Sequence, residues 1–372
     1  MEKFTIPTKI ISGSDSLKVL AAFESKKVLF VCDPFLDGSD TLKEIEHELP
    51  GSAEIKVFSD VKPNPPLTNI TEGVRVYQEF VPDVIITLGG GSAIDTAKAI
   101  RNFGEKILDQ QLECFVAIPT TSGTGSEVTN TAVVSDEANH AKFPIINDHL
   151  IPDIAILYPQ LVMSAPKSVT AYSGLDVMTH SLESLVARDG NLFTEALAEK
   201  AIDVIGKELV TAYREPDNLE VRKVVHEAAT AAGLAFNTAG LGITHSIAHQ
   251  LGAQFHVPHG LACAMLLPHV VAFNAQDKAC EEKYACAARK AGIADADSSN
   301  HMAVRQLIRK LQKMMRQMNC PETLAAFGVK PADAKQACAT IIAAAKEDGT
   351  FPGNPIVPTD EQLAAVYKKV IE

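Results

Sequence analysis

Hydrophobic patterning changes near Pro166 and divides the sequence into two unlike parts. Before it, short apolar runs alternate with helical spacing, most clearly at residues 28–32, 84–88 and 114–118. Runs that are apolar almost throughout are typical of strands covered on both faces, and their alternation with helices favours a mainly parallel sheet. After it, Ala- and Leu-rich segments with helical spacing continue to the end of the sequence. We therefore predict an α/β domain over residues 1–160 and an all-α domain over residues 161–372.

Composition excludes several classes of partner. The 372 residues carry a net charge of −12 without a Lys/Arg cluster, which argues against nucleic acid as a ligand. No apolar run is long enough to span a membrane, and the N-terminus lacks the layout of a signal peptide, so we expect a cytoplasmic protein without a membrane partner. The seven cysteines are scattered without a CxxC pair, which predicts reduced thiols that fill the core.

Two glycine-rich or hydroxyl-rich loops each follow a predicted strand. The run 84–88 leads into Gly89, Gly90, Gly91 and Ser92 and then a helix, and the run 114–118 leads into the loop 119–126. Glycines admit a ligand close to the backbone, and a helix N-terminus attracts phosphate, so a dinucleotide site is predicted here. Neither loop is the GxGxxG fingerprint.

One acidic residue could complete the dinucleotide site. Asp33 follows the run 28–32 and could accept hydrogen bonds from an adenosine ribose. A carboxylate before Pro34 is also a common turn former, and the residues alone leave both interpretations open.

A cluster of histidines and one carboxylate carries most of the chemical signal in the helical part. Asp176 and His180 are four residues apart, as are His245 and His249, so each pair lies on one helix face. His256 and His259 follow closely. A carboxylate with three imidazoles suits Fe²⁺ or Zn²⁺ at a catalytic site that keeps one position open. Six candidates thus compete for four ligand places.

At these motifs the sequence resembles the iron-containing alcohol dehydrogenases over essentially its whole length. The resemblance rests on residues 89–95, 117–129, 174–183 and 242–260. Within that family it is similar to propanol dehydrogenases of diol-degrading pathways and to the alcohol dehydrogenase half of bifunctional aldehyde-alcohol dehydrogenases. Two positions depart from the family pattern, because Ala93 stands where proline is usual and Ile356 where a basic residue is common.

The resemblance implies specific roles. Asp176, His180, His245 and His259 would hold Fe²⁺, with Zn²⁺ possible. His249 would be a catalytic proton relay, and Phe236 would border the substrate pocket. The residues that would bind NAD(H) are Asp33, Asn64, Gly89, Gly90, Gly91, Ser92, Asp95, Thr120, Thr121, Thr124, Thr129 and Lys142.

The resemblance also implies the reaction. We expect hydride transfer that interconverts a small primary alcohol, such as ethanol or 1-propanol, and its aldehyde, in a cleft between a dinucleotide-binding domain and a helical one. The fold would be dehydroquinate synthase-like, in a homodimer or larger homo-oligomer that could belong to an enzyme assembly or bacterial microcompartment.

Two other functions stay open. A polyol or glycerol-type dehydrogenase, or a dehydroquinate synthase-like lyase, would share the fold, although the apolar residues around the histidines favour a small apolar substrate. A non-catalytic assembly protein is the second alternative, and it would not need four ligands and His249 together.

Overall fold

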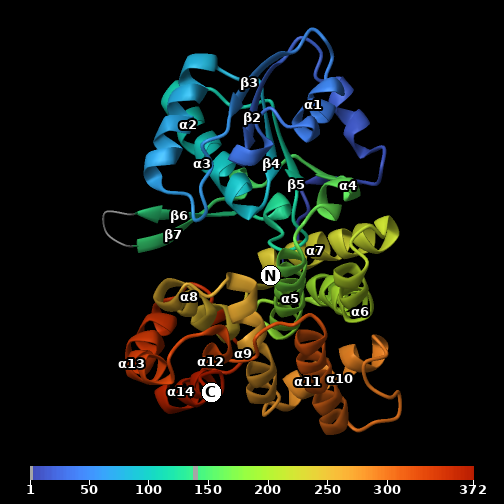
Figure 1. The fold of residues 1–372 in the computed structure, drawn as a ribbon, viewed down its shortest axis with the longest axis vertical. Helices are drawn as coiled ribbons and strands as arrows, with labels where there is room; N and C mark the ends of the chain where they lie inside the picture. Colours follow the sequence, from blue (N-terminus) through green and yellow to red (C-terminus); the bar gives the residue numbers. More distant parts are fainter. Residues whose placement is uncertain (1–2, 137–140) are drawn as a thin grey trace. The chain divides into compact units, whose positions relative to one another are not determined.

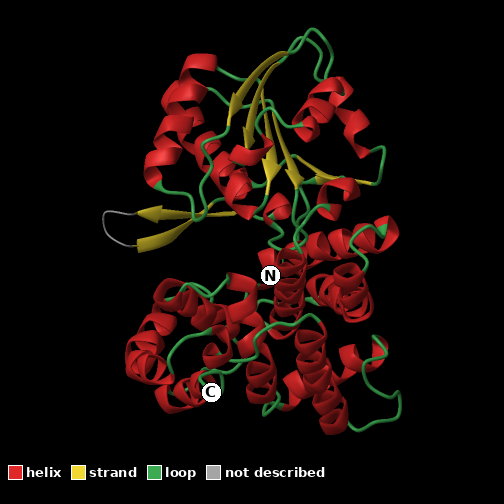
Figure 2. Ribbon diagram, in the orientation of Figure 1, coloured by secondary structure: helices red, strands yellow, loops and turns green. Residues whose placement is uncertain are grey.

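The computed structural model describes residues 3–136 and 141–372, without the side chains of residues 136, 141 and 142. The chain divides into two compact units, Thr5–Ala165 and Pro166–Glu372, and the second also includes the N-terminal residues up to Phe4. In the described part of the chain, all strands belong to the first unit, and the second is helical (Figure 1 and Figure 2). The prediction that an α/β region is followed by an all-α region is confirmed.

The first unit is built on a six-stranded sheet in which all paired neighbours are parallel. Its strands are, in spatial order, β1 (Lys9–Ser12), β8 (Ile154–Leu157), β5 (Cys114–Pro119), β4 (Val84–Gly89), β2 (Lys27–Cys32) and β3 (Glu54–Phe58). The three runs singled out in the sequence are the inner strands β2, β4 and β5. A separate antiparallel pair consists of β6 (Thr131–Asp136) and β7 (Ala141–Ile146).

Helices cover both faces of this sheet, which explains why its inner strands are apolar throughout. In β2, Val28 and Phe30 join one buried cluster with Leu42 and Ile45 of α1, whereas Leu29 and Val31 join another with residues of α2 and α3. The helices of this unit are α1 (Asp40–His47), α2 (Leu67–Phe80), α3 (Gly91–Leu108) and α4 (Pro159–Met163), with short 3₁₀ helices at Ser16–Ala22, Pro34–Leu36, Ser126–Val128 and Asp148–Leu150.

The register of the sheet brings the predicted loops together. Cys32 pairs with Leu88 and Gly89 pairs with Pro119, so β2, β4 and β5 end at the same edge. Ligands of open parallel sheets bind beyond the carboxyl ends of the strands. Asp33 and both predicted phosphate-binding loops therefore lie at the edge where a nucleotide is expected.

The second unit packs its helices around α5, of which nearly every residue from Thr170 onward is buried. Only glycine fits at Gly260, because a Cβ there would clash with the carbonyl oxygen of Tyr172. This close approach brings the first turn of α9 against α5 beside Asp176. The helices are α5 (Lys167–Val186), α6 (Leu192–Arg214), α7 (Leu219–Ala239), α8 (Ile243–Phe255), α9 (His259–Asn274), α10 (Lys278–Lys290), α11 (Asn300–Gln317), α12 (Leu324–Phe327), α13 (Pro331–Glu347) and α14 (Asp360–Lys368), with a 3₁₀ turn at Phe351–Gly353.

Among the described residues, no helix combines the length and the apolar character that a membrane span requires.

Candidate metal centre and nucleotide-binding loops

Four of the six candidate residues gather around the Asp176 carboxylate in the helical unit. Asp176 and His180 come from α5, His245 from α8 and His259 from the start of α9. The Asp176 Oδ1 atom lies 3.6 Å from Nε2 of both His245 and His259. The Asp176 Oδ2 atom lies 3.9 Å from Nε2 of His180. The i, i+4 spacing puts Asp176 and His180 on one face of α5, and Gly260 lets the start of α9, with His259, approach them.

The chemistry of this cluster fits a divalent metal ion. Asp176 Oδ1 and His245 Nε2 are buried atoms with no hydrogen-bond partner in the described part of the chain. Such atoms are costly unless something else satisfies them. Burial opposes ionisation of Asp176, but the three neighbouring histidines outweigh it and hold the pKa of this carboxyl well below its usual range. A charged carboxylate faced by imidazole nitrogens is a donor set that Fe²⁺ and Zn²⁺ accept.

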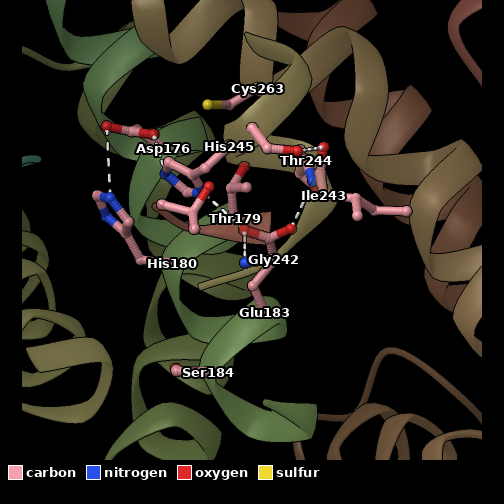
Figure 3. Close-up of polar contacts among 12 residues, drawn as sticks. Asp176, Thr179, His180, Glu183, Ser184, Gly242, Ile243, Thr244, His245 and Cys263 are labelled. Carbon is pink, nitrogen blue, oxygen red and sulfur yellow. Dashed lines mark hydrogen bonds and ion pairs between the residues drawn. The ribbon is translucent and has the colours of Figure 1, made fainter. Parts of the chain in front are cut away.

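A second carboxylate orients one of these histidines. Glu183, on α5, is buried, and its Oε2 atom lies 2.6 Å from His245 Nδ1 and accepts the N–H of Gly242 at 3.0 Å. Its Oε1 atom accepts the N–H of Thr244 at 2.7 Å. Figure 3 shows the Glu183 carboxylate facing the first turn of α8. With Nδ1 donating to Glu183, His245 presents a bare Nε2 lone pair toward Asp176, the tautomer that binds a metal.

Cys263 also faces the cluster. It lies one turn after His259 on α9, and its Sγ atom is 3.8 Å from His259 Nε2. Ligand atoms of Asp176, His245, His259 and Cys263 all lie within 4.8 Å of one another. Burial raises the pKa of this thiol to about 12 in the metal-free chain. Cys263 is buried in the core, as expected of the cysteines, but the i, i+4 spacing from His259 also gives its thiol a place beside the candidate ligands.

The remaining two histidines of the motif lie differently. His249 is 41% exposed, stacks on His259 with ring centroids 5.3 Å apart, and its Nδ1 atom is 2.8 Å from Asp348 Oδ2. Burial opposes ionisation of Asp348, but hydrogen bonds from His249 and Thr350 outweigh it and lower the pKa of this carboxyl. His256 ends α8 in a left-handed conformation with φ of 55°.

The aromatic ring of Phe236 lies against the cluster. Its centroid is 4.4 Å from that of His180, with the two rings inclined by 30°. An apolar ring therefore covers His180, one of the candidate ligands.

The two predicted phosphate-binding loops pack against each other. A Cβ on Gly91 would lie 2.8 Å from Thr124 Cγ2, and the Thr120 N–H donates to the Gly89 carbonyl at 2.9 Å. Asp33 Oδ2 accepts the Gly90 N–H at 3.4 Å. Burial raises the pKa of Asp33, although the Gly90 hydrogen bond partly opposes this. Asp33, the glycine loop and the threonine loop thus form one contiguous group, with Thr121 3.6 Å from the position of a Cβ on Gly90.

Two of the predicted nucleotide-binding residues hold the loops in place. Asp95 Oδ1 accepts a hydrogen bond from Ser126 Oγ at 2.7 Å, and Asp95 Oδ2 accepts the Val133 N–H at 3.0 Å. The buried Lys98 ammonium donates to Ser126 Oγ at 3.0 Å and to Thr129 Oγ1 at 3.1 Å. Burial lowers the pKa of Lys98 to about 8. Sequence reasoning missed Lys98, whose spacing from Asp95 on α3 was the available signal.

For the last three predicted nucleotide-binding residues, the structure gives only their position in the backbone or less. Ser92 lies in the first turn of α3, and Asn64 occupies a turn with φ of 52°. The side chain of Lys142 lies outside the described residues.

Comparisons with known proteins agree with this geometry. Residues 7–159 match the family "Iron-containing alcohol dehydrogenase", and residues 170–371 match "Fe-containing alcohol dehydrogenase family, C-terminal". The chain belongs to the iron-containing alcohol dehydrogenase family. It is therefore an oxidoreductase that interconverts an alcohol and its aldehyde, and its cofactors are iron and NAD(H). The lyase and assembly-protein alternatives gain no support from these matches.

Individual relatives cover the whole enzyme. It is 42% identical over 379 residues to the 1-propanol dehydrogenase PduQ of Citrobacter freundii, with all of both chains covered. It is 33% identical over 391 residues to an NADPH-dependent butanol dehydrogenase of Clostridium saccharobutylicum, covering 100% of this chain and 98% of the relative. The solved structure of an alcohol dehydrogenase from Oenococcus oeni superposes with a TM-score of 0.92 at 31% identity, with all of both chains covered.

Proposed function

We propose that the enzyme interconverts propanal-sized aldehydes and the matching primary alcohols at an iron centre held by Asp176, His180, His245 and His259. The observation that carries this proposal is a pair of buried donor atoms, Asp176 Oδ1 and His245 Nε2, which lack a hydrogen-bond partner among the described residues and lie close to further imidazoles. The substrate size is supported by two of the relatives, which are a 1-propanol dehydrogenase and a butanol dehydrogenase. The ring of Phe236 against His180 supports an apolar substrate.

The protein's own groups prepare this centre for catalysis. When bound, the divalent ion supplies Lewis-acid catalysis and the nicotinamide accepts or donates the hydride. Glu183 holds His245 in its ligating tautomer, because its carboxylate occupies the Nδ1 side of the ring. The Phe236 ring excludes water from one side of His180.

His249 is proposed to move the proton that the reaction needs. It lies one helical turn from His245 and stacks on His259, close to the ligands but 41% exposed. Asp348 fixes its ring through Nδ1, which leaves Nε2 to exchange a proton with the substrate oxygen. Its exposure supports proton exchange with solvent.

The nucleotide is proposed to bind along the carboxyl edge of the sheet. The loop backbone at Gly89–Gly91 and the N-terminus of α3 would receive the pyrophosphate, with Thr120, Thr121 and Thr124 beside it. Asp33 would accept hydrogen bonds from the ribose hydroxyls and repel the 2′-phosphate of NADP. Asp95 and Thr129 would support the loops from beneath.

Assembly remains a separate proposal. The side chains of Leu192 and Phe193 are 76% and 60% exposed, and Phe193 stacks on Phe4. Exposed apolar side chains of this size support a homodimer or larger homo-oligomer, which light scattering in solution would test. A location in the cytoplasm or inside a bacterial microcompartment stays a prediction.

A substrate panel tests the proposed activity. Iron-loaded enzyme is assayed with NADH and with NADPH against ethanal, propanal, butanal, dihydroxyacetone and a phosphorylated ketose. We expect the highest kcat/KM for the unsubstituted aldehydes with NADH. A preference for the polyhydroxylated or phosphorylated compounds would favour the polyol-type alternative instead.

A further inference from the structure

The two oxygen atoms of Asp176 face different groups of donors. Oδ2 faces His180, at 3.9 Å from its Nε2 atom. Oδ1 faces His245 and His259, at 3.6 Å from each Nε2 atom. Figure 3 shows His180 and Cys263 near different ends of the Asp176 carboxylate, with Cys263 toward the His245 end. An ion bound by Asp176, His245 and His259 therefore has two candidates for its fourth ligand. They are His180 and Cys263.

Three of the separations on the Oδ1 side are close to those of a tetrahedral centre. With metal bonds of about 2.0–2.2 Å to nitrogen and oxygen and about 2.3 Å to sulfur, neighbouring nitrogen and oxygen ligands lie about 3.4 Å apart, and sulfur lies about 3.6 Å from nitrogen. The corresponding distances here are 3.6 Å from Asp176 Oδ1 to each of His245 and His259, and 3.8 Å from Cys263 Sγ to His259. Small side-chain movements would complete an Asp-His-His-Cys site.

We propose that Cys263 is an alternative metal ligand, which replaces His180 when the centre takes a thiophilic ion such as Zn²⁺ or Co²⁺. This inference rests on the proposed metal site. Thiolate favours zinc, whereas iron(II) is well served by imidazole and carboxylate, so iron uses His180. Coordination breaks the S–H bond, forms the sulfur–metal bond and passes the proton to water, without any change of oxidation state.

The two ligand sets compete, because they share Asp176, His245 and His259. A single ion therefore occupies one set at a time. An ion held by sulfur leaves His180 without a bond to the metal. Cys263 thus influences which metal the enzyme retains, and the zinc-loaded form is the less active one.

Cobalt is the probe that tests this inference, because a thiolate bound to Co²⁺ gives an intense near-ultraviolet charge-transfer band that imidazole and carboxylate do not give. The metal-free enzyme is titrated with Co²⁺ and its absorbance recorded. We expect one Co²⁺ per chain with the band present in the wild type. Cys263→Ser should lose the band, and Cys280→Ser, which changes another buried cysteine of the helical unit, should keep it.

Substitution of His180 separates the two ligand sets. His180→Ala should still bind one Co²⁺ or Zn²⁺ with the sulfur band in the cobalt form, but should lose Fe²⁺. The double variant His180→Ala/Cys263→Ser should bind none of the three ions. Wild-type enzyme that binds one Co²⁺ without the band would overturn the role of Cys263 and leave the proposed metal site standing. Wild-type enzyme that binds no Co²⁺ would overturn both.

Discussion

Replacing Glu183 by glutamine removes one negative charge and almost no volume. The wild-type carboxylate accepts three hydrogen bonds, from His245 Nδ1 and from the N–H groups of Gly242 and Thr244. Glutamine has only one acceptor oxygen, so its NH₂ group must face either the Thr244 N–H or the His245 ring. In the second arrangement His245 accepts through Nδ1 and carries its proton on Nε2, which blocks metal binding.

The expected loss follows from these contacts. Partners of a metal-bound histidine typically contribute 10- to 100-fold to metal affinity, equivalent to roughly 1.4–2.7 kcal/mol. A hydrogen bond to a charged group contributes about 1.5–3 kcal/mol, which agrees with that range. We therefore expect Glu183→Gln to weaken metal binding 10- to 100-fold, and to destabilise the metal-free protein as well because α8 loses part of its N-terminal capping.

The assay compares metal affinity with stability. The dissociation constant for Co²⁺ is measured by competition with a chelator, and the free energy of unfolding of the metal-free protein by urea titration. Glu105→Gln is the matched control, because Glu105 is also buried and accepts from a backbone N–H at Leu112, from Arg101 and from His149 in the other unit. It should lower stability while leaving the metal affinity unchanged. Unchanged metal affinity in Glu183→Gln would refute the positioning role of Glu183.

Three further predictions concern other groups. His249→Ala should keep its metal but reduce aldehydes roughly a hundredfold more slowly, as expected for a lost acid–base group, whereas His259→Ala should lose the metal. Equal metal loss in both variants would show that the two roles are wrongly assigned. Asp33→Gly should shift the ratio of kcat/KM from NAD toward NADP by about 1–3 kcal/mol, and an unchanged ratio would make Asp33 a turn residue only. Burial lowers the pKa of His226 to about 4, so between pH 6.5 and 4 the unfolded chain binds more protons and stability falls by up to about 3 kcal/mol as the pH drops. His226→Gln should remove this part of the acid sensitivity in urea titrations at pH 7 and pH 4.5, and an identical loss in both proteins would contradict it.

The fold was predictable where burial is complete. β2, β4 and β5 are covered on both faces and therefore read as continuous apolar runs. The edge strand β3 has the exposed residues Glu54, Ile55 and Lys56, so its pattern is weak. Strands β6 and β7 pair with each other outside the main sheet, and no apolar run in the sequence predicted them. Edges and hairpins depend on pairing partners that local patterning does not specify.

The candidate site was predictable to the extent that it follows helix geometry. The i, i+4 pairs place Asp176 with His180 and His245 with His249 on single helix faces. The carboxylates that hold these histidines in place could not be predicted from helix geometry. Asp348 meets His249 across 99 positions of sequence, and Glu183 meets His245 across 62. Such partners depend on how helices pack, which one sequence without its structure does not reveal.

The most direct test of the proposed centre is turnover measured against metal content. NADH-dependent reduction of propanal is followed in enzyme of known iron and zinc content, then after chelation, and again after anaerobic return of Fe²⁺ or Zn²⁺. We expect activity to disappear with the metal and to return with one Fe²⁺ per chain, and to a smaller extent with Zn²⁺. Full turnover by enzyme shown to be metal-free would contradict the assignment of Asp176, His180, His245 and His259 as the catalytic metal site.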